Sequence, residues 1–461
     1  MNKPRLRCSA LGLLAVCSFG LSSESLHDIA GGVKPDRLRA DVETLVGFGT
    51  RHTLSDTESE LRGIGAARRW IQREFEAIGA GCAAPLEVTL LSEVVSGPRI
   101  PKPTEIVNVI AIQRGTLDPD RVVMMTADID SRVSDVLNAT ADSPGANDNA
   151  SGMAATLEAA RVLCKHTFAG TIVYAGLSGE EQGLYGGKIL ASHAQARNWR
   201  VMGVLNNDMV GNISGINGVI NNTTARVFSE GTRALESEED ARQRRYMGGE
   251  LDSPSRNIAR LVDRLADRYI PNLDVKMIYR LDRFGRGGHH IPLNEAGFPA
   301  VRIMETNEHY DRQHQDLRIE EGREYGDTIA YVDFDYAAKL TALNAITLAS
   351  MAGAPPFPAN VRIAGAVSAD TTLSWSLLSD RDGRVDASNL ASFRIHWRET
   401  TDPQWSFSRT VDATERAYTL NNIVIDNYFF GVSSVSVEGY ESPVVFPFVM
   451  GAFESTVEQP E

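Results

Sequence analysis

Residues 171–181 read TIVYAGLSGEE, an apolar run followed by two acids. Such a run is typical of a strand that is buried on both faces of a parallel sheet. Two other stretches have the same form: VVMMTADID at 122–130 and VMGVLNND at 201–208. Each is apolar along most of its length and turns acidic at its carboxyl end. The three segments therefore predict buried strands of one sheet.

The sequence around these strands indicates an α/β domain over residues 23–354. Apolar positions at helical spacing predict helices within 35–80 and over 151–163, and further strands are expected at 106–112 and 300–304. Strands that alternate with helices predict a mostly parallel twisted sheet that is flanked by helices.

A proline-rich linker, APPFP at 354–358, separates this domain from a region of different character. Beyond it, short alternating segments and turn residues predict an all-β sandwich of about seven strands over 355–461. The strands around Trp375 and Trp397, together with the closing GYESP at 439–443, resemble a fibronectin type III domain.

Residues 1–22 are predicted to be a secretory signal peptide. Basic residues precede an apolar run over 11–21, and small residues follow it. A transmembrane anchor needs roughly 20 apolar residues, so this run is too short for stable membrane insertion. A lipoprotein attached at Cys17 is the weaker alternative, because Val16 is bulky for the position before a lipidated cysteine. The sequence thus predicts a secreted or periplasmic protein.

Composition limits the partners. The net charge is −14, and removal of residues 1–22 with their three positive charges would bring it to −17. This charge disfavours nucleic acid and anionic membranes, and it favours cations such as metal ions or a protonated amine. Of the cysteines, Cys82 and Cys164 lie beyond the signal peptide. They could pair after export or remain separate buried thiols, and the sequence leaves both open.

Carboxylates gather where the predicted strands end. In open α/β sheets, ligands bind outside the carboxyl ends of the strands. These ends, with the loop PGANDNASG at 144–152, supply six acids: Asp128, Asp130, Asp148, Glu180, Glu181 and Asp208. An acid after a strand is often only a helix N-cap, but six that converge would repel one another unless cations neutralise them. No CxxC spacing is present, so histidine and carboxylates would hold the metal.

The motifs at these positions carry a family resemblance. PGANDNASG at 144–152, SGEEQGLYGG at 178–187 and NNDMVGN at 206–212 resemble the signatures of the aminopeptidase S-type metallopeptidases. This is metallopeptidase family 28, whose relatives include glutamate carboxypeptidase and glutaminyl cyclase. The likeness extends from about Val42 to Asp335, and the motifs together are highly specific.

The resemblance implies two zinc ions at the strand ends, bridged by an aspartate and a water. Asp148 would be the bridging ligand, Glu181 would bind one zinc ion and Asp208 the other. Glu180 would be the general base that takes a proton from the attacking water.

The closing ligand is expected to be a histidine. His314, in the string YDRQHQD at 310–316, matches this branch of the family, and His309 is its competitor. In the family, this imidazole completes the site of the zinc ion that Glu181 binds.

The chain departs from the family pattern at one ligand. The family has a histidine ligand two residues before a buried aspartate, whereas this chain reads DIDS at 128–131. One metal would then face Asp128, Asp148 and Asp208, an all-oxygen set that favours Mg²⁺, Mn²⁺ or Ca²⁺ over zinc. That site is expected to be weak, empty or filled by another divalent ion. Asp130 would remain as the group that orients the ligand at position 128.

A second departure mirrors the first, because His289 stands where the family has an aspartate. If Asp128 and His289 meet in the fold, His289 would supply the imidazole that position 128 lacks. A separation well beyond about 6 Å, the reach of a charge partner, would exclude this hypothesis. Two independent substitutions in a weakened or inactive copy are the alternative.

These observations predict a secreted exopeptidase that uses two metal ions to remove N-terminal residues from peptides or proteins. The acidic site would attract the free amino group of the substrate, and the sandwich would be an accessory module or a spacer. Two alternatives remain open. One is a catalytically weakened or inactive relative that acts as a binding protein. The other is a single-zinc enzyme of the glutaminyl cyclase type, which would keep Asp148, Glu181 and His314.

Overall fold

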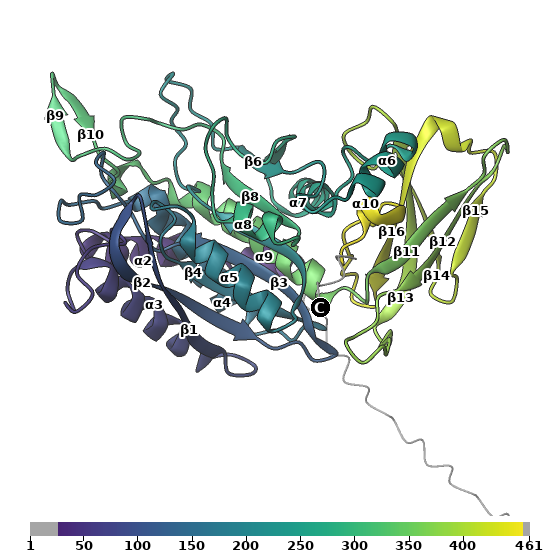
Figure 1. Ribbon diagram of the computed structural model, residues 1–461, viewed down its shortest axis with the longest axis horizontal. Coiled ribbons are helices and arrows are strands. Elements are labelled where there is room, and N and C mark those ends of the chain that lie inside the picture. Colours follow the sequence, from purple (N-terminus) through teal and green to yellow (C-terminus); the bar gives the residue numbers. More distant parts are fainter. Residues whose placement is uncertain (1–25, 455–461) are drawn as a thin grey trace, which may run out of the picture.

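The computed structural model describes residues 26–454, which form an α/β part and a C-terminal β part (Figure 1). The predicted signal peptide and the alternative lipidation site at Cys17 lie outside the described residues. The α/β part contains one eight-stranded sheet in the order β1-β2-β4-β3-β5-β8-β6-β7. Its strands are β1 (Glu87–Gly97), β2 (Ile100–Gln113), β3 (Asp118–Asp128), β4 (Gly170–Leu177), β5 (Arg200–Asn207), β6 (Thr224–Ser229), β7 (Asp274–Ile278) and β8 (Ala300–Glu305).

The sheet is mixed, with a parallel centre. Strand β3 pairs in parallel with β4 and β5, and β5 pairs in parallel with β8. Strands β1 and β2 are antiparallel, because only Pro98 and Arg99 connect them and so short a turn allows no crossover. Strand β2 is antiparallel to β4, and β6 to β8. The predicted α/β architecture with a following antiparallel β part is confirmed.

Helices cover both faces of the sheet (Figure 1). Side chains of β3 alternate between two cores: Val123 and Met125 belong to one, and Val122 and Met124 to the other. The first core also contains residues of α1 (Leu26–Gly32), α2 (Pro35–Gly47), α3 (Gly63–Gly79), α4 (Gly152–Leu163), α7 (Pro254–Tyr269) and α9 (Phe334–Gly353). The second contains residues of α5 (Tyr185–Ala196) and α8 (His290–Glu295). Both faces of β3 are therefore buried, as its unbroken apolar sequence predicts.

The C-terminal part consists of two three-stranded antiparallel sheets, β11-β12-β15 and β14-β13-β16. The strands are β11 (Pro358–Ala364), β12 (Thr371–Leu377), β13 (Leu390–Glu399), β14 (Phe407–Asp412), β15 (Ala417–Leu420) and β16 (Tyr428–Ser436). Trp375 of β12 and Phe393 of β13 join the two sheets with ring centroids 5.2 Å apart.

About seven strands were expected in this region, and the described residues contain six. After β16, the described residues add no further strand and form isolated bridges at Glu441 and Val445. Pro443 lies between the two bridges and has no N–H to donate to a ladder, which accounts for the missing strand.

Shorter elements complete the described chain. They are β9 (Arg318–Glu320), β10 (Arg323–Tyr325), α6 (Glu238–Met247), α10 (Phe448–Gly451), η1 (Ala146–Ser151), η2 (Ile329–Tyr331) and η3 (Ile425–Asn427). No helix in the described part of the chain is long and apolar enough to cross a membrane.

Two contacts tie distant segments together. Cys82, after α3, and Cys164, after α4, form a disulfide, which settles the alternative left open by the sequence. The linker after α9 packs against β3: buried Arg121 donates hydrogen bonds to Ala354 O at 2.8 Å and to Pro355 O at 3.2 Å. The linker is therefore part of the packed structure.

Burial of one acid gives a pH-dependent stability. Glu230 follows β6, and its Oε1 accepts hydrogen bonds from Ser255 Oγ at 3.4 Å and Asn294 Nδ2 at 3.2 Å. Burial raises the pKa of Glu230 from 4.5 to about 7, although the charge of Arg233 opposes the shift. The folded protein binds the proton of Glu230 more tightly than the unfolded chain does. The free energy of unfolding therefore falls as the pH rises from 4.5 to about 7 and this proton is lost.

We therefore expect Glu230→Gln to raise the free energy of unfolding at pH 8 by up to about 3 kcal/mol. The difference from the wild type should shrink at about pH 5, since the native carboxyl is then mostly protonated. Urea denaturation of both proteins at the two pH values measures this. A gain that is equal at both pH values would exclude titration of Glu230 as its cause.

Candidate metal centre

The parallel strands bring the predicted acids to one edge of the sheet. Strand β3 lies between β4 and β5 and runs in the same direction as both, so all three carboxyl ends meet there. Asp128 is the last residue of β3, Glu180 and Glu181 follow β4, and Asp208 follows β5. The predicted convergence of the strand-end acids is therefore present in the fold.

The loop that carries Asp148 is fixed from two sides. The carboxylate of Asp327 accepts the backbone N–H of Asp148 at 2.7 Å, and buried Arg51 donates to Gly145 O at 2.9 Å. The following helix α4 lies so close to β5 that a Cβ at Gly152 would come within 2.5 Å of Asn207 O. Glycine at 152 therefore lets this loop approach the strand ends.

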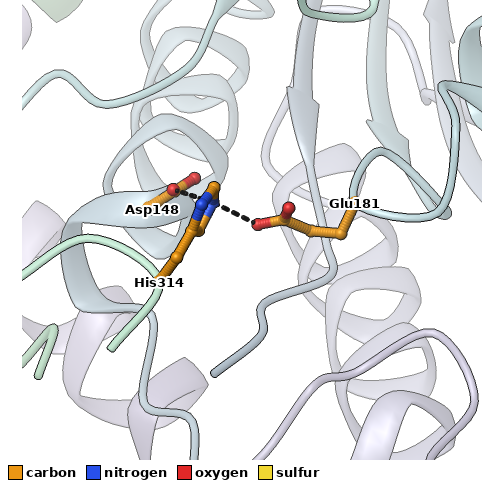
Figure 2. A group of neighbouring side chains, drawn as sticks. All are labelled: Asp148, Glu181 and His314. Carbon is orange, nitrogen blue, oxygen red and sulfur yellow. Dashed lines mark ion pairs between the residues drawn. The ribbon is translucent and has the colours of Figure 1, made fainter. Parts of the chain in front are cut away.

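Asp148, Glu181 and His314 come together at this edge, although they lie far apart in the sequence (Figure 2). His314 Nε2 lies 3.0 Å from Asp148 Oδ2 and 2.9 Å from Glu181 Oε1. His314 has a positive φ of 54°, a conformation that non-glycine residues adopt mostly where the surrounding structure imposes it.

The charges around Asp148, Glu181 and His314 favour a cation at this position. Burial opposes a charge on His314, but the carboxylates of Glu181 and Asp148 outweigh it and raise the pKa of His314 to about 10. Burial likewise opposes ionisation of Asp148 and Glu181, yet His314 holds the pKa of both below the usual range. Two carboxylates and one imidazole that face an open cleft match the three-ligand set of catalytic zinc sites. The residues present therefore fit one zinc ion.

Arg132 supports two of these ligands. Its Nε donates to Glu181 Oε2 at 2.8 Å, and its Nη2 lies 2.7 Å from His314 Nδ1. The other oxygen of Glu181 faces His314 Nε2. Arg132 thus holds both side chains in the orientation in which they converge.

Asp130 contacts the turn that carries the two glutamates. Its oxygens accept the backbone N–H groups of Glu180 at 3.2 Å and Glu181 at 3.1 Å, and the hydroxyl of Thr53 at 2.9 Å. Burial, with the carboxylates of Glu181 and Asp128 next, raises the pKa of Glu180 well above its usual value. Asp130 therefore fixes the backbone from which Glu180 extends.

The second predicted metal position is built differently. Asp128 Oδ1 lies 2.6 Å from His289 Nδ1, so the expected meeting of these two residues is confirmed. Burial lowers the pKa of His289 to about 4, and burial with the charge of Asp208 raises the pKa of Asp128 well above its usual value. Asp208 is paired with the buried Arg302 at 2.7 Å. Burial raises the pKa of Asp208 to about 6 against the charge of Arg302.

Two clusters in the described chain bring three or more possible ligand atoms within 4.8 Å of one another. One is Asp148, Glu181 and His314. The other is Asp263, Asp267 and Asp274, which contains no imidazole and is largely exposed. Asp128 and Asp208 belong to neither of these two clusters of the described residues.

Known proteins resemble this chain over nearly its whole length. A probable zinc metalloprotease of Leptosphaeria maculans is 41% identical over 427 residues, which are 92% of this chain and 97% of that protein. A probable zinc metalloprotease of Pyricularia oryzae is 41% identical over 439 residues, 94% of this chain and 86% of that one. The sequence model of peptidase family M28 matches residues 108–324. The chain belongs to peptidase family M28.

The fold agrees with this membership. The LapA aminopeptidase of Legionella pneumophila superposes with a TM-score of 0.51 and 18% identity, over 71% of this M28 chain and 74% of that one. The predicted membership of metallopeptidase family 28 is thus confirmed.

A cleft of about 590 Å³ opens beside the metal centre of this M28 protein. Its acidic lining residues are Asp148, Glu180, Glu181 and Asp208. Its basic lining residues are Arg99, Arg132, Arg283 and Arg286. His314 also lines this cleft, whereas its competitor His309 lines a neighbouring small cavity and is not part of the metal-binding cluster.

Four residues around the centre were not identified from the sequence: Arg51, Arg132, Arg302 and Asp327. Arg132 directly follows the DIDS string at 128–131, so its position was a usable signal. Nothing in the local sequence marks Asp327 or Arg302, because each acts on a segment more than 90 residues away.

Proposed function

We propose that this protein is an exported metal-dependent exopeptidase that removes N-terminal residues from peptides or proteins. The observation that carries the proposal is the position of Glu180 in the same cleft as Asp148, Glu181 and His314. A carboxylate without a metal-binding role, next to a three-ligand zinc set, is the arrangement that hydrolytic zinc enzymes use. Relatives named probable zinc metalloproteases support zinc as the metal.

The residues of the chain divide the work of hydrolysis. Asp148, Glu181 and His314 would hold the zinc ion, which when bound polarises the scissile carbonyl and lowers the pKa of a water. Glu180 takes a proton from the attacking water and delivers it to the leaving amine. Asp130 holds the backbone of Glu180 in place through the hydrogen bonds described above.

The cleft supports a substrate that enters by a chain end. Its volume of about 590 Å³ lies in the range of sites that enclose a small ligand or a short segment of chain. The acids at its floor complement a protonated N-terminal amine, while the arginines complement carbonyl or carboxylate groups of the same segment. These features favour removal of terminal residues over cleavage within a folded protein.

Export and the accessory role of the C-terminal part belong to the same proposal. The disulfide between Cys82 and Cys164 supports an oxidising compartment, as the N-terminal sequence predicts. The fibronectin-like sandwich would serve as a fixed support for the peptidase part, since the linker between them is packed and buried.

A single-zinc enzyme of the glutaminyl cyclase type is the second candidate. One observation favours it: the described residues bring together one ligand set that contains an imidazole, Asp148, Glu181 and His314. Cyclisation of an N-terminal glutamine needs the same polarised carbonyl and the same proton transfer. The experiment must therefore separate the two reactions.

The test incubates zinc-loaded protein with one peptide in three forms: a free N-terminal leucine, an acetylated leucine and an N-terminal glutamine. We expect mass spectrometry to show stepwise loss of residues from the free leucine peptide and no change in the acetylated one. A zinc chelator should lower the rate of the reaction by at least about 100-fold, because the metal supplies several kcal/mol of transition-state stabilisation. Added zinc should restore the rate.

Three other outcomes of this test would support a different function. Loss of ammonia from the glutamine peptide without cleavage would identify the cyclase. Internal cleavage of the acetylated peptide would contradict an exopeptidase. Bound zinc without any of these reactions would favour the non-enzymatic alternative.

A further inference from the structure

We propose that the Asp128–His289 pair, together with Arg302, closes the second metal position, so that this protein holds a single zinc ion. The inference rests on the proposed zinc-dependent function but concerns how many ions the chain itself can bind. It differs from the expectation of two zinc ions per chain. Three sets of contacts carry it: those of Asp128, His289 and Asp208.

Asp128 already has a buried partner on each oxygen. Its Oδ1 is hydrogen-bonded to His289 Nδ1 at 2.6 Å, and its Oδ2 accepts from Asn149 Nδ2 at 2.8 Å. Asn149 is itself fixed, because its amide also donates to Asn207 O at 2.8 Å and its Oδ1 accepts from Met209 N at 3.1 Å. Both oxygens of Asp128 are thus oriented by buried contacts, and a metal there would compete with these hydrogen bonds, whose loss is costly.

The ring of His289 is held by its surroundings, with Nδ1 directed at Asp128. The residue is fully buried, and its Nδ1 is engaged by Asp128. Its other side packs against α5, where a Cβ at Gly187 would lie 3.0 Å from His289 Cδ2. The ring is therefore packed between a strand end and a helix, with Nδ1 held by Asp128.

Asp208 faces a fixed positive charge. Arg302 Nη2 lies 2.7 Å from Asp208 Oδ2, and Nη1 donates to Asp282 Oδ2 at 3.0 Å and to Gly287 O at 2.6 Å. Both Arg302 and Asp208 are buried. A divalent cation at Asp208 would be close to this guanidinium in a poorly screened environment, and like charges there repel strongly. Arg302 thus supplies the positive charge that a second metal would otherwise bring.

The remaining three residues form one converging cluster. Asp148, Glu181 and His314 turn their ligand atoms toward one another (Figure 2), and they line the cleft. The supporting Arg132 contacts Glu181 through Oε2 and leaves Oε1 facing His314. One site is therefore organised for a metal, and the other is filled by hydrogen bonds and an ion pair.

The experiment counts zinc ions on the full-length folded protein and on the exchange variant Asp128→His/His289→Asp. Elemental analysis follows dialysis against trace zinc and gel filtration. We expect one zinc ion per chain in the wild type, and two only when Arg302→Met is added to the exchange variant, because the guanidinium still faces Asp208 in the double variant. The double substitution keeps the same two side chains in one buried pocket and restores a histidine at the position where the family resemblance places a ligand.

Control variants connect the count to particular residues. Asp148→Asn should lose the single zinc ion, whereas Asp208→Asn should retain it, because Asp208 binds Arg302 instead of a metal. Should the exchange variant not fold, titration of the wild type with Co²⁺, followed by visible absorbance, decides the point by an end point at one equivalent.

Two results would overturn the inference without affecting the proposed function. These are two zinc ions in the wild type with loss of one in Asp208→Asn, and a folded exchange variant with the added Arg302→Met that still binds only one. A wild-type protein that binds no zinc would refute the inference together with the proposed function.

Discussion

Replacement of Glu180 by glutamine is expected to lower kcat by about 10³-fold and to leave the zinc content unchanged. General acid–base catalysis by a positioned carboxylate typically contributes 10²- to 10⁴-fold, and glutamine can neither take nor return the proton. Glu180 lies in the cleft beside the metal centre but is not one of the three converging ligands. The loss should therefore appear in kcat with little change in KM, since glutamine keeps the shape of the side chain.

The neighbouring residue provides the matched control. Glu181→Gln makes the same chemical change one position along, but it removes a ligand that His314 Nε2 approaches to 2.9 Å. We expect this variant to lose zinc and activity together. Steady-state kinetics and elemental analysis of both variants separate the roles, and a Glu180→Gln protein that lacks zinc or keeps full activity would contradict the assignment.

Asp252→Asn is expected to reduce the free energy of unfolding by about 3–5 kcal/mol, the usual cost of removing one partner of a buried ion pair. Asp252 precedes α7 and is fully buried between Arg260 of the same helix and Arg398 of β13. Its Oδ1 lies 2.8 Å from Arg260 Nη1, and its Oδ2 lies 2.8 Å from Arg398 Nη2. The asparagine would leave two buried guanidinium groups without a counter-charge between the α/β part and the C-terminal sheets.

Urea denaturation followed by tryptophan fluorescence measures this loss. Asp382→Asn is the control, since Asp382 pairs with Arg384 where both side chains are at least two-thirds exposed. Exposed pairs contribute about 0–1 kcal/mol, so this variant should resemble the wild type. If the two variants were equally stable, the Asp252 cluster would not be what joins the two parts.

The expectations from sequence succeeded where the deciding signal was local. Unbroken apolar runs predicted β3, β4 and β5, because strands covered on both faces need no polar alternation. Because parallel strands end at the same edge of a sheet, the acids directly after those runs had to lie at one edge. The proline-rich linker at 354–358 likewise marked the start of the β part, since the ring of proline ends the preceding helix.

Other features depended on chain segments that no local pattern connects. The sequence showed that Asp128 and His289 depart from a family pattern, but only the fold shows that they touch at 2.6 Å. The predicted number of strands in the C-terminal part exceeds the number in the described residues by one. Pro443 interrupts a segment whose alternation resembles a strand. Disulfide formation between Cys82 and Cys164 also required the helices before them to be placed side by side.

By itself, the sequence determined the classes of secondary structure, their order along the chain, the family and the acids available for chemistry. These properties depend on hydrophobic periodicity and on neighbours along the chain, which can be read directly. Only the tertiary structure decided which acids serve a metal: it pairs Glu181 with His314, and Asp208 with Arg302. The physical reason is that a carboxylate's role depends on the charged groups that the fold places beside it, and His314 and Arg302 each lie more than 90 positions from the carboxylate that they contact.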